Sequence, residues 1–130
     1  MPKPRDVLIG VRKRALRLPE ARETLTFGNP TFQARTKTFA VLDRYRGRRC
    51  LCFKAALADQ ARLCRDVRFF IAPYGGKHGW TCLDVDGRFR FTEVEALLLE
   101  SYRLVAPKRL VATLEAARPR RPKRGGARRL

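Results

Sequence analysis

The chain lacks several features that would assign it to a common class of protein. No apolar run approaches the roughly 18 residues that a membrane-spanning helix needs, so we expect no membrane association. The first apolar patch is interrupted by Arg12, Lys13 and Arg14, and no small-residue cleavage site follows it, so we expect no signal peptide. A single histidine, His78, leaves little material for a histidine-based metal or catalytic site.

Acidic residues are also scarce. The 130 residues contain 12 Asp and Glu against 30 Lys and Arg, which gives a formal net charge of +18. Residues 118–130 hold seven of the basic side chains, no acid, two prolines and two glycines, and this composition predicts a disordered tail. The remaining residues, 1–117, keep an excess of basic side chains and match the size of one domain. Such a field attracts polyanions, although arginine-rich codon usage in a GC-rich genome would produce the same excess.

The four cysteines do not form a recognisable metal motif. Cys50, Cys52, Cys64 and Cys82 include no C-x-x-C pair, and structural zinc sites usually need two closely spaced pairs. Cys50 and Cys52 are two residues apart on an expected strand and therefore face the same way. We expect reduced thiols packed as small apolar groups in a cytoplasmic protein, with a metal site or redox pair as the alternative.

Hydrophobic periodicity predicts an α+β fold. Two-residue alternation is typical of half-buried strands and helical spacing of amphipathic helices. Together they indicate one two-layer domain, an antiparallel sheet of β-hairpins with helices packed on one face. The expected elements are a helix over 7–18 capped by Asp6, extended chain over 24–35 with a turn at 28–30, a hairpin over 38–54, a helix over 55–67, a strand over 68–71, a hairpin over 80–91 around Asp86-Gly87, a helix over 93–104 behind a capping box of Thr92 and Glu95, and a last helix from Pro107 to Ala117.

Arginines gather at both expected hairpins. In the first hairpin, alternation places Phe39, Val41 and Tyr45 on one face, and the arginines lie around its tip. In the second, arginines alternate with phenylalanines, and Lys77 and His78 lie in the loop before its first strand. Arginine pairs bidentately with phosphate and can read guanine edges, although charged residues on edge strands also prevent aggregation. The candidate nucleic-acid-binding residues are Arg44, Arg46, Arg48, Arg49, Lys77, His78, Arg88 and Arg90.

The glycine-rich segment 75–80 invites a phosphate-loop interpretation. It lacks G-x-x-x-x-G-K-[ST], and a strand rather than a helix is expected to follow it. We expect instead a tight loop that positions Trp80 against the core, with stacking on a base as the alternative. A nucleophilic pair of His78 with a cysteine has no supporting motif, so we expect neither enzymatic activity nor a cofactor.

Several segments resemble the MmcQ/YjbR family. They are 18–20 (LPE), 26–32 (TFGNPTF), 37–40 (KTFA), 73–80 (PYGGKHGW) and 101–110 (SYRLVAPKRL), and they occur in the family's order. Thr36 stands where the family usually has glycine, which predicts a different turn there. The resemblance implies a bacterial α+β domain similar to secretion-chaperone-like folds, with DNA binding through projecting hairpin "wings". It implies no catalytic residues.

These observations lead to one expected function and one alternative. We expect a non-enzymatic protein that binds nucleic acid, with double-stranded DNA favoured, through arginine-bearing hairpins and the basic tail. Contacts to the phosphate backbone would give little sequence specificity. The alternative is a protein-interaction or chaperone-like module that binds an acidic or apolar partner. No small-molecule cofactor or metal is expected in either case.

Overall fold

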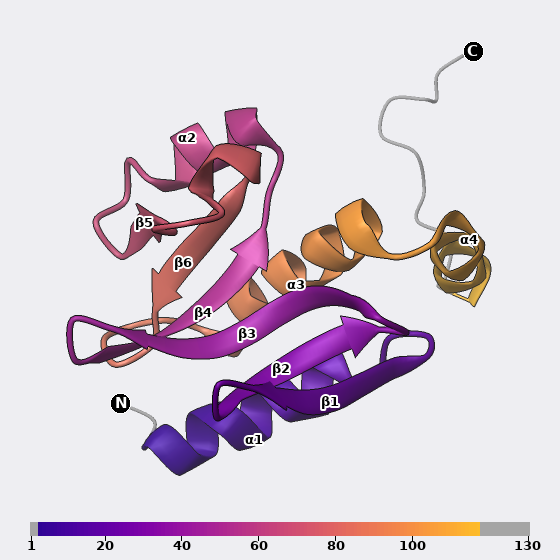
Figure 1. The fold of residues 1–130 in the computed structure, drawn as a ribbon, viewed down its shortest axis with the longest axis horizontal. Helices are drawn as coiled ribbons and strands as arrows, with labels where there is room; N and C mark the ends of the chain where they lie inside the picture. Colours follow the sequence, from indigo (N-terminus) through magenta and orange to yellow (C-terminus); the bar gives the residue numbers. More distant parts are fainter. Residues whose placement is uncertain (1–2, 118–130) are drawn as a thin grey trace.

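The structure, a computed structural model, describes residues 3–117 and shows a six-stranded antiparallel sheet with helices (Figure 1). The strand order is β1-β2-β3-β4-β6-β5. This arrangement confirms the predicted α+β class. The elements are α1 (Pro4–Ala15), β1 (Ala21–Thr26), β2 (Asn29–Ala34), β3 (Lys37–Tyr45), β4 (Arg48–Lys54), α2 (Leu57–Leu63), β5 (Phe69–Ile71), the 3-10 turn η1 (Gly76–His78), β6 (Trp80–Asp84), α3 (Phe91–Val105) and α4 (Lys108–Ala117).

Two tight turns shape one end of the sheet. The β1–β2 hairpin turns at Phe27 and Gly28, with φ of 51° and 81°, and the β3–β4 hairpin turns at Arg46 and Gly47, with φ of 53° and 76°. Two successive residues with positive φ are the signature of a two-residue type I′ turn, whose twist suits the flanking strands. Because β1 and β3 run the same way in the sheet, both hairpin tips project from the same end.

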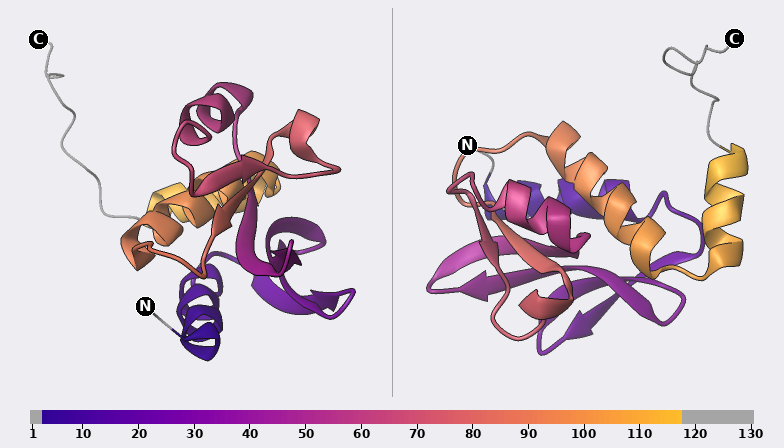
Figure 2. Two further views of the ribbon diagram at one scale, coloured as in Figure 1. Left: turned by 90° about the vertical axis from the view of Figure 1, so that its left-hand side faces the viewer. Right: turned by 90° about the horizontal axis from the view of Figure 1, so that it is seen from above.

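The two faces of the sheet carry different clusters. Helices α1 and α3 cover one face (Figure 2), where Leu51 and Phe53 of β4 join the main core. The alternate residues of the same strand, Cys50 and Cys52, point to the other face and form a smaller buried cluster with Cys82. Alternation along β4 therefore separates an aliphatic and aromatic core from a thiol cluster.

A register shift changes the face of Phe39. Phe32 of β2 lies opposite Ala40 of β3, and Gln33 lies opposite Thr38, so Phe39 has no partner on β2. Such a bulge inserts one residue and interrupts the two-residue alternation. Phe39 consequently packs in the main core against Tyr102 of α3, with ring centroids 5.4 Å apart. The prediction that it shares a face with Val41 and Tyr45 is wrong.

The predicted second hairpin is also wrong. Strand β6 pairs with β4 on one edge and with β5 on the other, so no edge is left for residues 88–91. Those residues form a loop and the start of α3. The predicted orientations of three side chains are nonetheless confirmed, since Phe89 is buried and Arg88 and Arg90 are exposed.

Helix boundaries differ from the prediction in ways that local chemistry explains. Helix α1 begins at Pro4, since proline is well suited to the first turn, and Lys3 rather than Asp6 is its N-cap. Helix α3 begins at Phe91 with Arg90 as N-cap, and Glu93 accepts the Arg90 amide N–H at 3.0 Å. The predicted box of Thr92 and Glu95 is therefore wrong in register.

The remaining expectations on chain organisation are met in part. Helix α2 spans seven residues, less than the predicted 55–67, and α4 closely matches the predicted last helix. The basic tail expected at 118–130 lies outside the described residues. Among the residues described, no helix has the length and apolarity to cross a membrane.

Candidate nucleic-acid interface

Four segments meet at the end of the sheet that carries the hairpin tips. They are the β1–β2 turn, the β3–β4 turn, the N-terminus of α1 and the loop from β6 to α3, all toward the left of Figure 1. The loop is fastened to β4, because the Asp86 carboxylate accepts the Arg49 backbone N–H at 2.7 Å. The Val85 N–H in turn donates to the Arg49 carbonyl at 3.0 Å. Segments far apart in sequence thus form one surface, here called the hairpin end.

A hollow of about 410 Å³ opens at this end, between the start of α1 and the two hairpins. Its basic lining residues come from three elements, with Arg5 on α1 and Arg44 and Arg49 paired across β3 and β4. Gly28, Asn29 and Pro30, part of the segment 26–32 singled out above, form another part of its wall. Cations from separate elements therefore converge on one depression.

The arginines of the β3–β4 hairpin differ in their partners. Within residues 3–117, no carboxylate forms an ion pair with the side chains of Arg44, Arg46 or Arg49. Arg48 instead donates from Nε to Asp84 at 2.7 Å. This hydrogen bond raises the pKa of Arg48, and the pKa of Asp84 lies below its usual value because hydrogen bonds from Arg48 and the loop outweigh the effect of burial. Three of the four predicted arginines are therefore available to an external anion.

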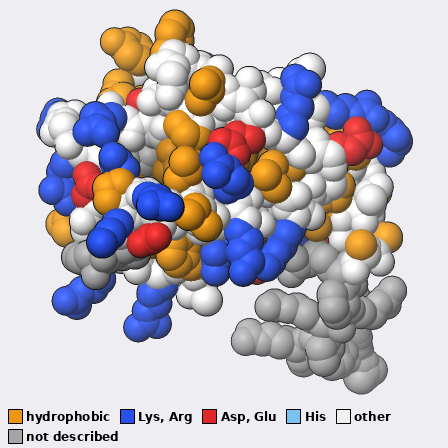
Figure 3. Space-filling view, turned by 90° about the horizontal axis from the view of Figure 1, so that it is seen from below, with side chains coloured by type: hydrophobic (Ala, Val, Ile, Leu, Met, Phe, Trp, Pro, Cys, Tyr) orange, Lys and Arg blue, Asp and Glu red, His pale blue; other side chains and the backbone are white. Residues whose placement is uncertain are grey.

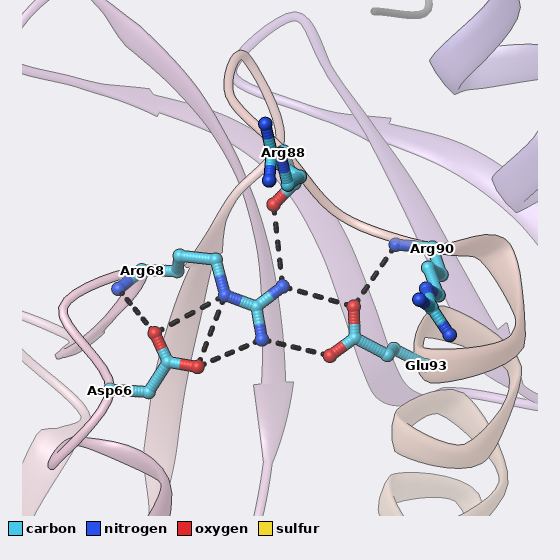
Figure 4. A network of polar contacts seen from close by, with 5 residues as sticks. All are labelled: Asp66, Arg68, Arg88, Arg90 and Glu93. Carbon is cyan, nitrogen blue, oxygen red and sulfur yellow. Dashed lines mark hydrogen bonds and ion pairs between the residues drawn. The ribbon is translucent and has the colours of Figure 1, made fainter.

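Arg88 and Arg90 belong to the loop beside this hairpin, where their backbones take part in a polar network (Figure 4). Arg68 pairs with both Asp66 and Glu93 at 2.8 Å and also donates to the Arg88 carbonyl. These hydrogen bonds lower the pKa values of Asp66 and Glu93. The guanidinium groups of Arg88 and Arg90 form none of the hydrogen bonds drawn in this network, although the charge of Arg90 helps to lower the pKa of Glu93.

Lys77 and His78 lie elsewhere. Both are in η1, just before β6, whereas the hairpin end begins where β6 finishes at Asp84. The five residues of β6 separate the two places by roughly 14 Å along the strand. The structure thus brings six of the eight predicted residues to one end and leaves Lys77 and His78 at the other.

Two residues at the hairpin end escaped the sequence analysis. Arg5 reaches the hollow only because α1 packs across the sheet, and no local pattern marks it. Phe27 is fully exposed at the tip of β1–β2 and adopts positive φ, which is unfavourable for a bulky residue. A phenylalanine directly before Gly-Asn between two extended segments was a signal that could have been used.

The cysteines also come together, on the open face of the sheet. The Sγ atoms of Cys52 and Cys82 are 3.0 Å apart and those of Cys50 and Cys52 are 3.8 Å apart, whereas Cys64 follows α2 on its own. All four are free thiols. Hydrogen bonds from Cys52 and Cys82 lower the pKa of Cys50, whereas the hydrogen bond with Cys50, together with burial, raises the pKa values of Cys52 and Cys82. The alternative left open by the sequence, a metal or redox site, therefore has a geometric basis.

Positive charge is not confined to the hairpin end. Figure 3 shows Lys and Arg side chains across the face seen from below, with fewer acidic ones between them. Of the carboxylates, many are engaged by arginines, as in the pairs Arg12–Glu23 and Arg35–Glu20. What distinguishes the hairpin end is that Arg5, Arg44 and Arg49 converge on a hollow, and that Arg44, Arg46 and Arg49 form no ion pair with a carboxylate of the described residues.

Comparison with known proteins assigns the fold to a family. No curated protein matches the chain. A family model described as YjbR matches residues 16–104, which is more than half of the chain and extends from the end of α1 to the end of α3. The match covers the sheet, both hairpin tips and the loop that carries Arg88 and Arg90. The chain therefore belongs to the YjbR family.

Proposed function

We propose that this domain binds double-stranded DNA through its hairpin end, without catalysis and with little sequence preference. The main contacts would join phosphates to Arg44, Arg46 and Arg49, with Arg5 across the hollow. Contacts of this kind position a protein on a duplex without reading its bases. We place this activity in the cytoplasm of a bacterium, with the tail at 118–130 adding loose electrostatic attraction.

One observation carries this proposal. Three arginines of one hairpin lie at a projecting end of the sheet, and no described carboxylate pairs with them, although arginines elsewhere on the chain take up many of the acids. A guanidinium without a protein partner retains its full hydrogen-bonding capacity for phosphate. Convergence of such groups from α1, β3 and β4 supports a site rather than a dispersed charge.

Phe27 adds an apolar contact to the same end. It projects from the tip of β1–β2 next to Gly28, which borders the basic hollow. Architectural DNA-binding proteins insert apolar side chains between base steps and kink the duplex. We propose that Phe27 contacts the bases or the groove floor while the arginines hold the backbone. The two projecting wings are then β1–β2 and β3–β4, in place of the pair expected from the sequence.

A second candidate function rests on a neighbouring hollow of about 550 Å³, which lies between β5 and the β3–β4 hairpin and shares Arg46 and Arg49 with the proposed DNA contacts. Its apolar lining residues are Val67, Phe70, Ile71 and Pro73, and Val67 is 97% exposed. Exposed apolar groups beside a sheet edge favour a protein partner. This surface supports the protein-interaction alternative, in which the partner would cover β5.

The test compares charge-matched variants on a labelled duplex of about 20 base pairs over a series of salt concentrations. One variant carries Arg44→Gln, Arg46→Gln and Arg49→Gln. The control carries Lys37→Gln, Arg65→Gln and Arg109→Gln, which remove the same charge at exposed positions away from the hairpin end. Full-length chains and chains ending at Ala117 are both measured.

The hairpin variant and the control should differ in the slope of log affinity against log salt as well as in affinity. Each phosphate contact contributes about −0.9 to the slope of log affinity against log salt, so loss of three contacts should flatten it by about 2.7. Phe27→Ala should weaken binding by roughly 5- to 150-fold with the slope unchanged, since stacking is worth about 1–3 kcal/mol. Equal losses in the hairpin and control variants, or binding that disappears with residues 118–130, would refute the proposal.

A further inference from the structure

We propose that Cys50, Cys52 and Cys82 form a three-thiolate site for a soft monovalent metal ion, Cu(I). The inference does not rest on DNA binding, because none of the three cysteines lines the arginine hollow, although Arg46 and Arg49 lie near both sites. It rests on how the strands place the sulfurs, on what surrounds them and on the opening that leads to them.

The register of β4 and β6 brings two thiols together. Backbone hydrogen bonds join Arg49 to Val85 and Ala55 to Gly79, which makes Cys52 and Cys82 a non-hydrogen-bonded pair. In such pairs the two strands approach most closely and the side chains stand next to each other. Cys50 is two residues from Cys52 on the same strand, so its thiol lies on the same face.

The sulfurs fit around one ion. Their Sγ atoms all lie within 4.8 Å of one another, at 3.0 Å for Cys52–Cys82 and 3.8 Å for Cys50–Cys52. Sulfurs bound to a common ion at about 2.3 Å stand roughly 3.8–4.0 Å apart. The closest pair would have to separate by about 1 Å, and the Cys50–Cys82 pair, which lies within 4.8 Å, would have to change by no more than about 1 Å. A disulfide, by contrast, would need the closest sulfurs to approach to about 2.05 Å.

The ligand set selects the ion. Thiolates favour soft ions, and zinc usually takes four ligands. In the described part of the chain, no histidine nitrogen or carboxylate oxygen joins the three sulfurs. The thiols are at most 5% exposed, which leaves little access for a water ligand. Cu(I), which accepts soft ligands and does not require a fourth, fits this site better than zinc.

The surroundings provide a route and a balancing charge. Cys50 lies at the floor of the 550 Å³ hollow beside β5, so an ion can reach the cluster from there. Arg46 and Arg49 line the same hollow and offset part of the negative charge that three thiolates around one Cu(I) retain, whereas Arg48 is already paired with Asp84 there. On binding, the thiol protons leave to solvent and three copper–sulfur bonds form, with no change of oxidation state.

The experiment titrates the reduced full-length protein with Cu(I) under anaerobic conditions, in competition with a chromophoric Cu(I) chelator. We expect one equivalent to bind, with thiolate-to-copper charge-transfer absorption and three sulfur neighbours in X-ray absorption. Fluorescence of Trp80, the only tryptophan, should change on binding because its ring packs against the cluster. Cys52→Ala and Cys82→Ala should each weaken binding at least 100-fold.

Cys64→Ala is the matched control, since Cys64 lies outside the cluster. It should bind Cu(I) as the parent protein does. Circular dichroism and thermal unfolding verify that each variant folds, and Cys50→Ala serves if another variant does not. The proposal is wrong if binding survives in Cys52→Ala, if it depends on Cys64, or if Zn(II) binds and Cu(I) does not. It is equally wrong if protein kept under reductant shows a mass lower by two hydrogens, indicating a Cys52–Cys82 disulfide.

Discussion

Replacing Arg68 with glutamine should destabilise the domain measurably, because this side chain joins two parts of the fold. Its guanidinium donates to both carboxylate oxygens of Glu93 at the start of α3, at 3.0 and 2.8 Å. It also donates to Asp66, just before β5, and to the Arg88 carbonyl. Glutamine keeps part of the aliphatic stem but cannot span the two carboxylates.

The expected loss follows from the exposure of the network. The side chains of Arg68 and Glu93 are 28% and 34% exposed, so solvent screens the pair in part. Exposed ion pairs contribute about 0.2–1 kcal/mol and hydrogen bonds to charged groups about 1.5–3 kcal/mol. We expect Arg68→Gln to lower the free energy of unfolding by about 1–2 kcal/mol, which is roughly 4–8 °C in Tm for a domain of this size.

The loss should also depend on pH. Arg68 lowers the pKa values of Asp66 and Glu93 in the folded protein. Their contribution to stability is therefore complete at pH values above their pKa values in the unfolded chain, about 4–4.5. That stability disappears as pH falls through the lowered folded values. The difference between parent and variant should therefore be constant from about pH 7 to 5 and shrink toward about pH 3.

Urea denaturation at a series of pH values measures both effects. Arg62→Gln is the control, because Arg62 makes a single 3.3 Å contact with Asp59 and both side chains are more than half exposed. It should cost no more than about 0.5 kcal/mol. The reasoning fails if Arg68→Gln costs no more than Arg62→Gln, or if the gap between parent and Arg68→Gln stays the same down to about pH 3.

Three further variants test local features of the fold. Ser101→Ala should lower the free energy of unfolding by about 2–3 kcal/mol in urea denaturation. The buried hydroxyl donates to a β3 carbonyl at 2.6 Å and accepts a β4 amide N–H at 2.9 Å, and its removal leaves both backbone groups unpaired. An unchanged denaturation midpoint would contradict this. Gly79→Ala should cost more than about 2 kcal/mol in thermal unfolding, since φ is +98° and a Cβ would meet the Ala55 carbonyl; a Tm within about 2 °C of the parent would count against it. Arg46→Asn should raise stability by about 0.5–1 kcal/mol, because asparagine accepts the positive φ of a type I′ turn more readily; a lower Tm would show that the arginine is not strained there.

Local patterns predicted the β3–β4 hairpin and its arginine tip because everything that defines them is adjacent in sequence. Alternation marks the two strands, and Arg46-Gly47 supplies the turn. The same reasoning failed at Asp86-Gly87, where an equally good turn signal stands between two alternating segments. There, β4 and β5 pair with the two edges of β6, so residues 88–91 cannot pair with it as the second strand of a hairpin.

The candidate site also contains residues that could be predicted from local sequence and residues that could not. Arg44, Arg46 and Arg49 could be predicted from their clustering, whereas the approach of Arg5 depends on how α1 crosses the sheet. Lys77 and His78 were grouped with the arginines because they precede the same expected hairpin. Pairing of β6 with β4 then placed them at the opposite end of the strand.

The α+β class, the first hairpin, the family resemblance and the excess of positive charge can all be predicted from the sequence. These depend on periodicity, turn residues and composition, which are properties of neighbouring residues. Tertiary structure was needed to show that the β1–β2 hairpin, with Phe27 at its tip, projects from the same end as the β3–β4 hairpin, and that Cys82 joins Cys50 and Cys52. Both features depend on the order and register of the strands. Order and register depend in turn on which distant segments compete for the same sheet edge and the same core, and no local pattern encodes that competition.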